Sequence, residues 1–134
     1  MIKKVLAGLL VASFLSAPAL AAVNAVTVQK IVKGGTSTTI TSTGLLTTDT
    51  YTFQNDGRVF IHFKKTGAGA ATVTIVTQAT SQGLAITDQT ATVAATTGDV
   101  YVGPFPPSLF NDASANVTFS FSDTVGLSFE VMRL

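Results

Sequence analysis

The residues able to do acid–base or metal chemistry are few in this 134-residue chain. It has one histidine, His62, no cysteine and seven acidic residues. His62 lies between Ile61 and Phe63 in an apolar stretch, which favours a structural or interface role over catalysis. Strand alternation gives it Phe60 and Lys64 as neighbours, and neither orients an imidazole for catalysis. A lone histidine without cysteine also excludes His–His and Cys-based metal sites.

The acidic residues are spread singly, with no two closer than seven positions. An acid–base pair would therefore have to form across strands. Asp56, Asp99, Asp112 and Asp123 lie in turn-like segments. Capping of turns is the simplest interpretation, and a Ca²⁺ site built from these loops is the alternative. There is no G-x-S-x-G motif, and the Gly67-Ala68-Gly69 segment precedes a strand pattern instead of a helix. We expect no enzyme, no cofactor and no metal.

Short strands must position these residues. Apolar and polar residues alternate in brief segments separated by Gly, Asn-Asp and Pro signals, and residues 22–134 keep no helical period. About eight strands without intervening helices predict an antiparallel all-β domain. That many strands are expected to form two sheets packed face to face, as in a jelly-roll or immunoglobulin-like sandwich. The expected core of the last two strands is Val117, Phe119, Phe121, Leu127, Phe129 and Val131.

Residues 1–21 have the pattern of a secretory signal peptide. Lys3 and Lys4 precede the apolar run Val5–Leu15, and Ala19-Leu20-Ala21 forms a cleavage box. The run would span only about 16 Å as a helix, too short for a membrane anchor. A buried N-terminal helix and an unused upstream start are the alternatives. The remaining chain divides into residues 22–50, an N-terminal strand and Thr-rich arm, and residues 51–134, the β-sandwich core.

The charge of the chain is low. Cleavage after Ala21 removes Lys3 and Lys4 from eight basic residues, which leaves six against seven acidic ones and changes the net charge from +1 to −1. Charged residues make up 11% of the chain, against about 25% in a typical domain. We expect no nucleic-acid partner, because the basic surface it needs is missing. Little charge repulsion opposes self-association.

Three segments are candidates for contacts with other molecules. The alternation in residues 25–33 slips in phase, which a bulge near Gln29-Lys30 would explain. The Thr-rich tract 36–50 has little to bury and is expected to be a weak edge strand or a mobile arm that reaches a neighbour. The proline-rich stretch 103–107 forms either an exposed apolar loop or a rigid corner. The candidate interface residues are Val26, Val28, Ile31, Ile40, Leu45, Leu46, Phe105, Leu109 and Phe110.

Two blocks, NDGRVFIHFKK at Asn55–Lys65 and GDVYVGPFPPSLFND at Gly98–Asp112, carry a family resemblance. With the strands that follow, residues 24–134 resemble small virion proteins of tailed bacteriophages, the head decoration, cement or minor structural proteins. The resemblance implies a β-sandwich outside the capsid, an oligomer such as a trimer, and a major capsid protein as partner. It implies no catalytic residues. The leader departs from the family, whose members assemble in the host cytoplasm.

The sequence therefore predicts a structural assembly protein, in the first place a capsid decoration or cement protein on the virion exterior. The alternative is a secreted bacterial filament or surface-layer subunit, which assembles by strand exchange after cleavage near Ala21. A carbohydrate-binding module is a third interpretation. The absence of Trp and the presence of only two tyrosines, Tyr51 and Tyr101, weaken it.

Overall fold

The structure is a computed structural model that describes residues 20–134, so nearly all of the expected leader lies outside the described residues. The described chain is nearly all β, with eleven strands and one four-residue helix. In chain order the elements are β1 (Val23–Ala25), β2 (Gln29–Lys30), β3 (Thr50–Gln54), β4 (Val59–Lys65), β5 (Ala71–Ile75), β6 (Thr80–Ser81), β7 (Leu84–Ala85), β8 (Gln89–Val93), β9 (Gly98–Val102), α1 (Pro107–Phe110), β10 (Asn116–Phe121) and β11 (Leu127–Arg133). None of residues 20–134 belongs to a helix that is long and apolar enough to cross a membrane. The all-β prediction is confirmed.

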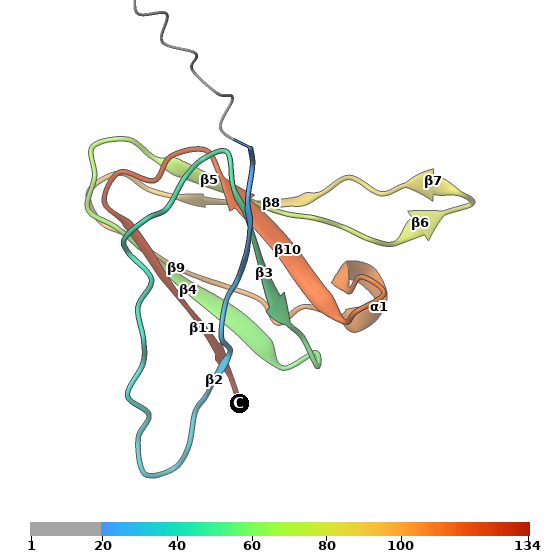
Figure 1. The fold of residues 1–134 in the computed structure, drawn as a ribbon, viewed down its shortest axis with the longest axis horizontal. Helices are drawn as coiled ribbons and strands as arrows, with labels where there is room; N and C mark the ends of the chain where they lie inside the picture. The colour runs from blue at the N-terminus through green and yellow to red at the C-terminus, as the bar shows by residue number, and fades with distance from the viewer. Residues whose placement is uncertain (1–19) are drawn as a thin grey trace, which may run out of the picture.

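Two main sheets form the body of the molecule (Figure 1). The five-stranded sheet has the order β1-β3-β10-β5-β8, and the four-stranded sheet has the order β2-β11-β4-β9. The pairs are antiparallel, as expected, except at one edge of each sheet, where β1 runs parallel to β3 and β2 runs parallel to β11. A third, two-stranded sheet contains β6 and β7.

The two main sheets share an aromatic core. The ring centroid of Phe119 in β10 lies 5.3 Å from that of Phe129 in β11 and 6.1 Å from that of Phe63 in β4. None of the three side chains is more than 1% exposed. These contacts join opposite sheets, so the apolar faces of the two sheets pack against each other. The six core residues expected from the last two strands are all buried: Val117, Phe119, Phe121, Leu127, Phe129 and Val131.

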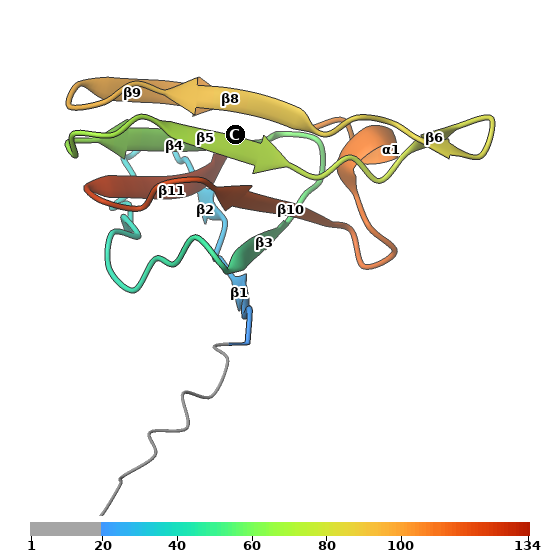
Figure 2. The same cartoon turned by 90° about the horizontal axis from the view of Figure 1, so that it is seen from above.

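Strands β5 to β8 form one long hairpin that extends beyond the body (Figures 1 and 2). Its tip is the pair Gln82 and Gly83, with φ of 52° and 81°, the left-handed conformations that two-residue hairpin turns require. At its base, Thr77 N donates to the carboxylate of Asp88 at 2.8 Å. All residues from 80 to 90 are exposed. The distal half of this hairpin therefore adds nothing to the core.

Residues 22–33 run along one side of the body and join both sheets. β1 extends the five-stranded sheet and β2 extends the four-stranded sheet, so the chain crosses between the sheets at residues 26–28 (Figure 1). Val26 and Val28 are half-buried against the core. The bulge expected at Gln29-Lys30 is wrong. The apolar alternation slips in phase because the chain changes sheets at this point.

The Thr-rich tract 36–49 is an irregular arm that hydrogen bonds fix to the body at several points. Thr41 forms an isolated bridge with Phe129, in which each backbone N–H donates to the other residue's carbonyl, at 2.8 and 2.9 Å. The side-chain amide of Gln29 binds both backbone polar groups of Thr39. Leu45 packs on the core from within the arm. The arm and the N-terminal strand thus bury part of their apolar surface within their own chain.

The proline-rich stretch is a rigid corner. Phe105 is 1% exposed and Phe110 is 3% exposed, with their rings in an edge-on contact at 5.7 Å. Asn55 fixes the corner, because its Nδ2 donates to the Phe105 carbonyl at 2.8 Å and to Asn111 Oδ1 at 2.7 Å. Phe105 and Phe110 are core residues here, so their assignment as exposed interface residues is wrong. Their apolar surface is covered by the protein itself.

Candidate functional site

One group of polar and titratable side chains lies on the outer face of the four-stranded sheet. We call it the His62 cluster, and it consists of His62, Lys64, Asp99, Tyr101 and Glu130. In the strand register, His62 of β4 is directly opposite Glu130 of β11 and Tyr101 of β9. Asp99 lies opposite Lys64, two positions along β9. Alternation turns these residues to the same face, so three neighbouring strands place them together.

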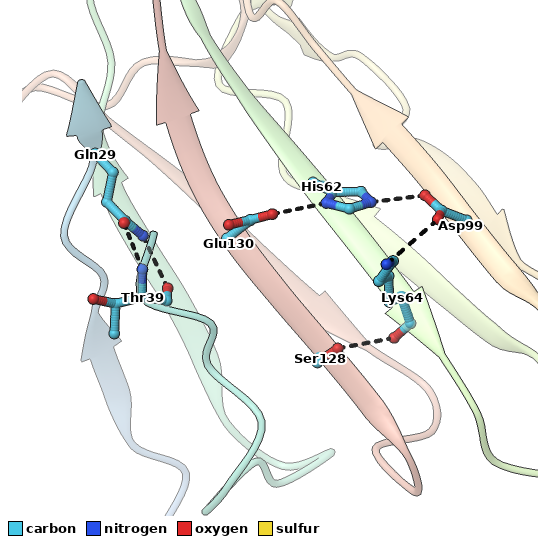
Figure 3. Close-up of polar contacts among 7 residues, drawn as sticks. All are labelled: Gln29, Thr39, His62, Lys64, Asp99, Ser128 and Glu130. Carbon is cyan, nitrogen blue, oxygen red and sulfur yellow. Dashed lines mark hydrogen bonds and ion pairs between the residues drawn. The ribbon is translucent and has the colours of Figure 1, made fainter. Parts of the chain in front are cut away.

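The imidazole of His62 is held from both sides (Figure 3). Its Nδ1 lies 2.8 Å from Glu130 Oε1, and its Nε2 lies 2.7 Å from Asp99 Oδ1. The Tyr101 ring stacks on it at 4.2 Å with an angle of 4°. Lys64 Nζ is 3.8 Å from the other oxygen of Asp99. Each ring nitrogen thus lies at hydrogen-bond distance from a carboxylate oxygen, and which ring nitrogen carries the hydrogen depends on the tautomer.

Glu130 is the more buried of the two carboxylates. The side chain of Glu130 is 11% exposed, against 53% for Asp99. Burial raises the pKa of the Glu130 carboxyl, but the hydrogen bond with His62, the nearby Thr38 hydroxyl and the charge of Lys64 together outweigh it and lower this pKa below its usual value. Glu130 Oε2 is buried, and among the described residues no donor reaches it with hydrogen-bond geometry. The Thr38 hydroxyl therefore affects the pKa of Glu130 as a nearby polar group, without forming a hydrogen bond to it.

The contacts of the His62 cluster join three neighbouring strands, β9, β4 and β11, through side chains. Glu130 and Asp99 lie on opposite sides of the imidazole ring, so the three groups do not converge on one point where a metal could bind. Residues 20–134 contain no group of three or more His, Cys, Asp or Glu side chains arranged to hold a metal ion. The hydroxyl of Ser128, which lies opposite Lys64 in β11, donates to the Lys64 carbonyl at 3.5 Å (Figure 3).

Among residues 20–134, no substrate-sized cavity opens beside His62. The hollow next to it measures about 10 Å³, room for no more than one water molecule. Two larger open grooves, of about 430 and 640 Å³, lie elsewhere, beside residues 24–29. The second contains an ion pair at 3.2 Å between Asp56 and Arg133. Neither groove includes His62 or its two carboxylate partners.

The predicted interface residues are divided by the structure into three groups. Ile31, Ile40 and Leu46 are exposed, at 37%, 54% and 53%. Four others, Val26, Val28, Leu45 and Leu109, are half-buried and pack on the core. Phe105 and Phe110 are buried, as described above. Ile31, Ile40 and Leu46 are therefore the members of the predicted set with the most exposed side chains.

The partners of His62 are a correction to the sequence-based expectation. Phe60 and Lys64 are its neighbours on the same strand face, but the groups that bind its ring come from β9 and β11. Alternation along one strand gives only same-strand neighbours, whereas the cross-strand register selects the direct contacts. The expected turn-capping role is confirmed for Asp56, Asp112 and Asp123, which accept backbone N–H bonds. Asp99 differs, because it lies in β9 and binds His62.

Comparisons with known proteins give no relative for this chain. No family model, no curated protein and no solved structure matches it. Its function therefore has to be argued from its own geometry.

The lowered pKa of Glu130 gives a prediction of pH dependence for the Glu130→Gln variant. Because the pKa is lower in the folded chain than in the unfolded chain, the stabilising contribution is fully present above the unfolded value of about 4.3. It is lost as the pH falls through the lower, folded value. We expect the unfolding free energy of the wild type to decrease more steeply below pH 4.3 than that of Glu130→Gln, in urea titrations from pH 3 to 6. Parallel curves would show that Glu130 is not coupled to folding.

Proposed function

We propose that the chain is a non-enzymatic structural subunit, a β-sandwich that assembles with other copies through segments projecting from its body. The observation that carries this proposal is the hairpin of β5 to β8, whose distal half lies entirely outside the core (Figure 2). A two-stranded hairpin is only marginally stable alone in water. Such an extension becomes stable when the hairpin packs against a partner.

The surface chemistry of the distal hairpin suits a protein contact. Residues 76–87 carry no charged side chain. Leu84 is 74% exposed and Ile86 is 39% exposed, although both are large aliphatic residues. Exposed aliphatic side chains on an uncharged hairpin lose water at little electrostatic cost when a second protein covers them. Ile40 and Leu46 give the arm a smaller surface of the same kind.

Two settings for this assembly remain as proposals. The resemblance of residues 24–134 to head decoration proteins supports a capsid exterior, with an oligomer such as a trimer bound to a major capsid protein. The signal-peptide pattern of residues 1–21 supports an exported filament or surface-layer subunit. In either setting a stable contact needs to bury more than about 1,000 Å², which exceeds what Leu84 and Ile86 offer and requires the sheet edges as well.

A shortened hairpin tests the proposal. Residues 80–85 are replaced by Asn-Gly, a pair that closes two-residue turns, between Ala79 and Ile86, which the Ile86 N–H bond to the Ala79 carbonyl already joins at 3.4 Å. We expect this variant to keep the unfolding midpoint within a few degrees of the wild type, because the removed residues lie outside the core. We expect the wild type to form higher-order species and this variant to lose them, measured by analytical ultracentrifugation and electron microscopy.

Two point variants separate a contact from a general change of the surface. Leu84→Ser removes an exposed aliphatic side chain from the hairpin, and Val125→Ser removes one of similar exposure, 69% against 74%, from a different loop. Assembly should weaken in Leu84→Ser and remain in Val125→Ser. Equal effects of the two variants, or full assembly of the shortened hairpin, would contradict the proposal.

A further inference from the structure

Within residues 20–134, Ala22 is the first residue whose backbone N–H and carbonyl both form hydrogen bonds to the body. Its backbone N donates to Asp49 Oδ1 at 3.1 Å, and its carbonyl accepts from Thr50 N at 2.9 Å. Asp49 is 5% exposed. The other carboxylate oxygen of Asp49 accepts from Asn24 Nδ2 at 2.9 Å. A buried carboxylate thus lies at the point where the chain enters β1.

The residues immediately before Ala22 are not held in this way. Leu20 is 89% exposed, and Ala21 is exposed. Neither forms a hydrogen bond to the rest of residues 20–134. Within residues 20–134, hydrogen bonding to the body therefore begins directly after the Ala21–Ala22 bond. The small-residue pattern predicts cleavage by a signal peptidase at this same bond.

We propose that Asp49 is a binding site for the α-ammonium group that cleavage after Ala21 creates at Ala22, so that processing fixes the N-terminal strand onto β3. Hydrolysis by the signal peptidase adds one water across the peptide bond. Ala21 leaves as a carboxylate, and the nitrogen of Ala22 becomes an amine. An α-amino group has a pKa of about 7.7 to 8.0, so this amine takes up a proton at neutral pH.

Cleavage replaces a neutral amide donor by a charged one at the same position. Hydrogen bonds between charged partners are shorter and stronger than those from neutral amides. Asp49 is prepared for this role. The Ala22 backbone N–H first, then the Asn24 side chain, lower the pKa of the Asp49 carboxyl against the opposing effect of burial. The carboxylate is therefore charged when the ammonium group forms.

The consequence is local to the N-terminal strand. β1 has three residues and β2 has two, and both pair only at sheet edges. Such short parallel pairs hold the crossing segment weakly, so an ion pair at its start changes how firmly it is fixed. The inference rests on the exported setting of the proposed function. It does not depend on the hairpin, whose test can fail or succeed independently.

The test uses the full chain with its leader, exported and processed by a bacterial host. A second version carries Gly-Ser inserted between Ala21 and Ala22, which moves the ammonium group two residues away while keeping it in the protein. Each version is made with Asp49 and with Asp49→Asn. Mass spectrometry establishes the N-terminus. Amide hydrogen exchange at Thr50, which donates to Ala22, reports on the docking of the first residue, and urea unfolding reports on stability.

We expect the unaltered version to begin at Ala22. Asp49→Asn should lower its folding equilibrium constant roughly two- to fivefold more than it lowers that of the Gly-Ser version, as for a partly exposed ion pair. Exchange at Thr50 should be slower in the unaltered version than in the Gly-Ser version, and this difference should vanish with Asp49→Asn. A native start at another residue overturns the inference. So does equal Thr50 exchange in the two Asp49 versions, a comparison that holds even if the Asp49→Asn variants do not fold.

Discussion

Phe119→Ala is expected to lower the free energy of unfolding by about 3–5 kcal/mol, the usual cost of removing a buried phenylalanine. The Phe119 side chain is fully buried. Its ring contacts rings from both sheets, among them Tyr51 and Phe53 in its own sheet and Phe63 and Phe129 in the other. Truncation leaves a cavity at the centre of the core, where neighbours from two sheets cannot both move inward. Urea unfolding monitored by circular dichroism measures the change.

Phe60→Ala is the matched control for this prediction. Phe60 is also an aromatic residue in a central strand, but it lies on the outer face of β4 and is half-buried. The same truncation there exposes its site to water and leaves no closed cavity, so we expect a loss of roughly 1–2 kcal/mol. A similar loss in both variants would mean that the core does not depend on the contact between the sheets.

The core could be predicted because its pattern is local. In β10 and β11, aromatic and aliphatic residues occur at every second position, and that period alone places Phe119, Phe121 and Phe129 on an inner face. The turn signals Asn55-Asp56-Gly57 and Asn111-Asp112 are equally local. What could not be predicted from them is that the two asparagines bind each other across the corner. That contact depends on where distant turns meet.

The candidate site was largely hidden from the sequence for the same reason. The carboxylates that bind His62 lie 37 and 68 positions away in the chain. Only the order β9-β4-β11 and its register bring them together. The crossing of residues 26–28 between sheets was likewise visible only as a slip in phase. A slip has several physical causes, and the sequence contains nothing that distinguishes a bulge from a change of sheet.

The burial of Lys65 could have been predicted from the sequence. Lys65 directly follows the exposed Lys64, yet alternation places it on the inner face of β4 with Ile61 and Phe63. The structure agrees with the alternation, since Lys65 is 1% exposed. Its Nζ donates to the Val125 carbonyl at 2.5 Å and lies 3.3 Å from Asp123 Oδ2. A charged group at the end of an apolar row marks the point where the inner face meets the turn 123–126.

Lys65→Ala should therefore destabilise the fold by about 3 kcal/mol, which combines the lost packing of the buried stem with the loss of a donor to a buried carbonyl. Lys65→Met keeps most of the stem and removes only the ammonium group. We expect it to recover part of the loss, leaving a deficit of about 1–2 kcal/mol because the Val125 carbonyl lacks its donor. Urea unfolding at neutral pH measures both variants.

Lys64→Ala is the control on the neighbouring residue. The Lys64 side chain is 56% exposed and lies 3.8 Å from Asp99, so its removal should change the unfolding free energy by no more than about 0.5 kcal/mol. Together, the three variants separate what the aliphatic stem of Lys65, its ammonium group and its buried position each contribute to the unfolding free energy. If Lys65→Met proved as stable as the wild type, the ammonium group would contribute nothing beyond its stem. The turn 123–126 would then be held by its other contacts, such as the Thr66 N–H bond to the Gly126 carbonyl at 2.9 Å and the Val125 N–H bond to Asp123 Oδ1 at 2.8 Å.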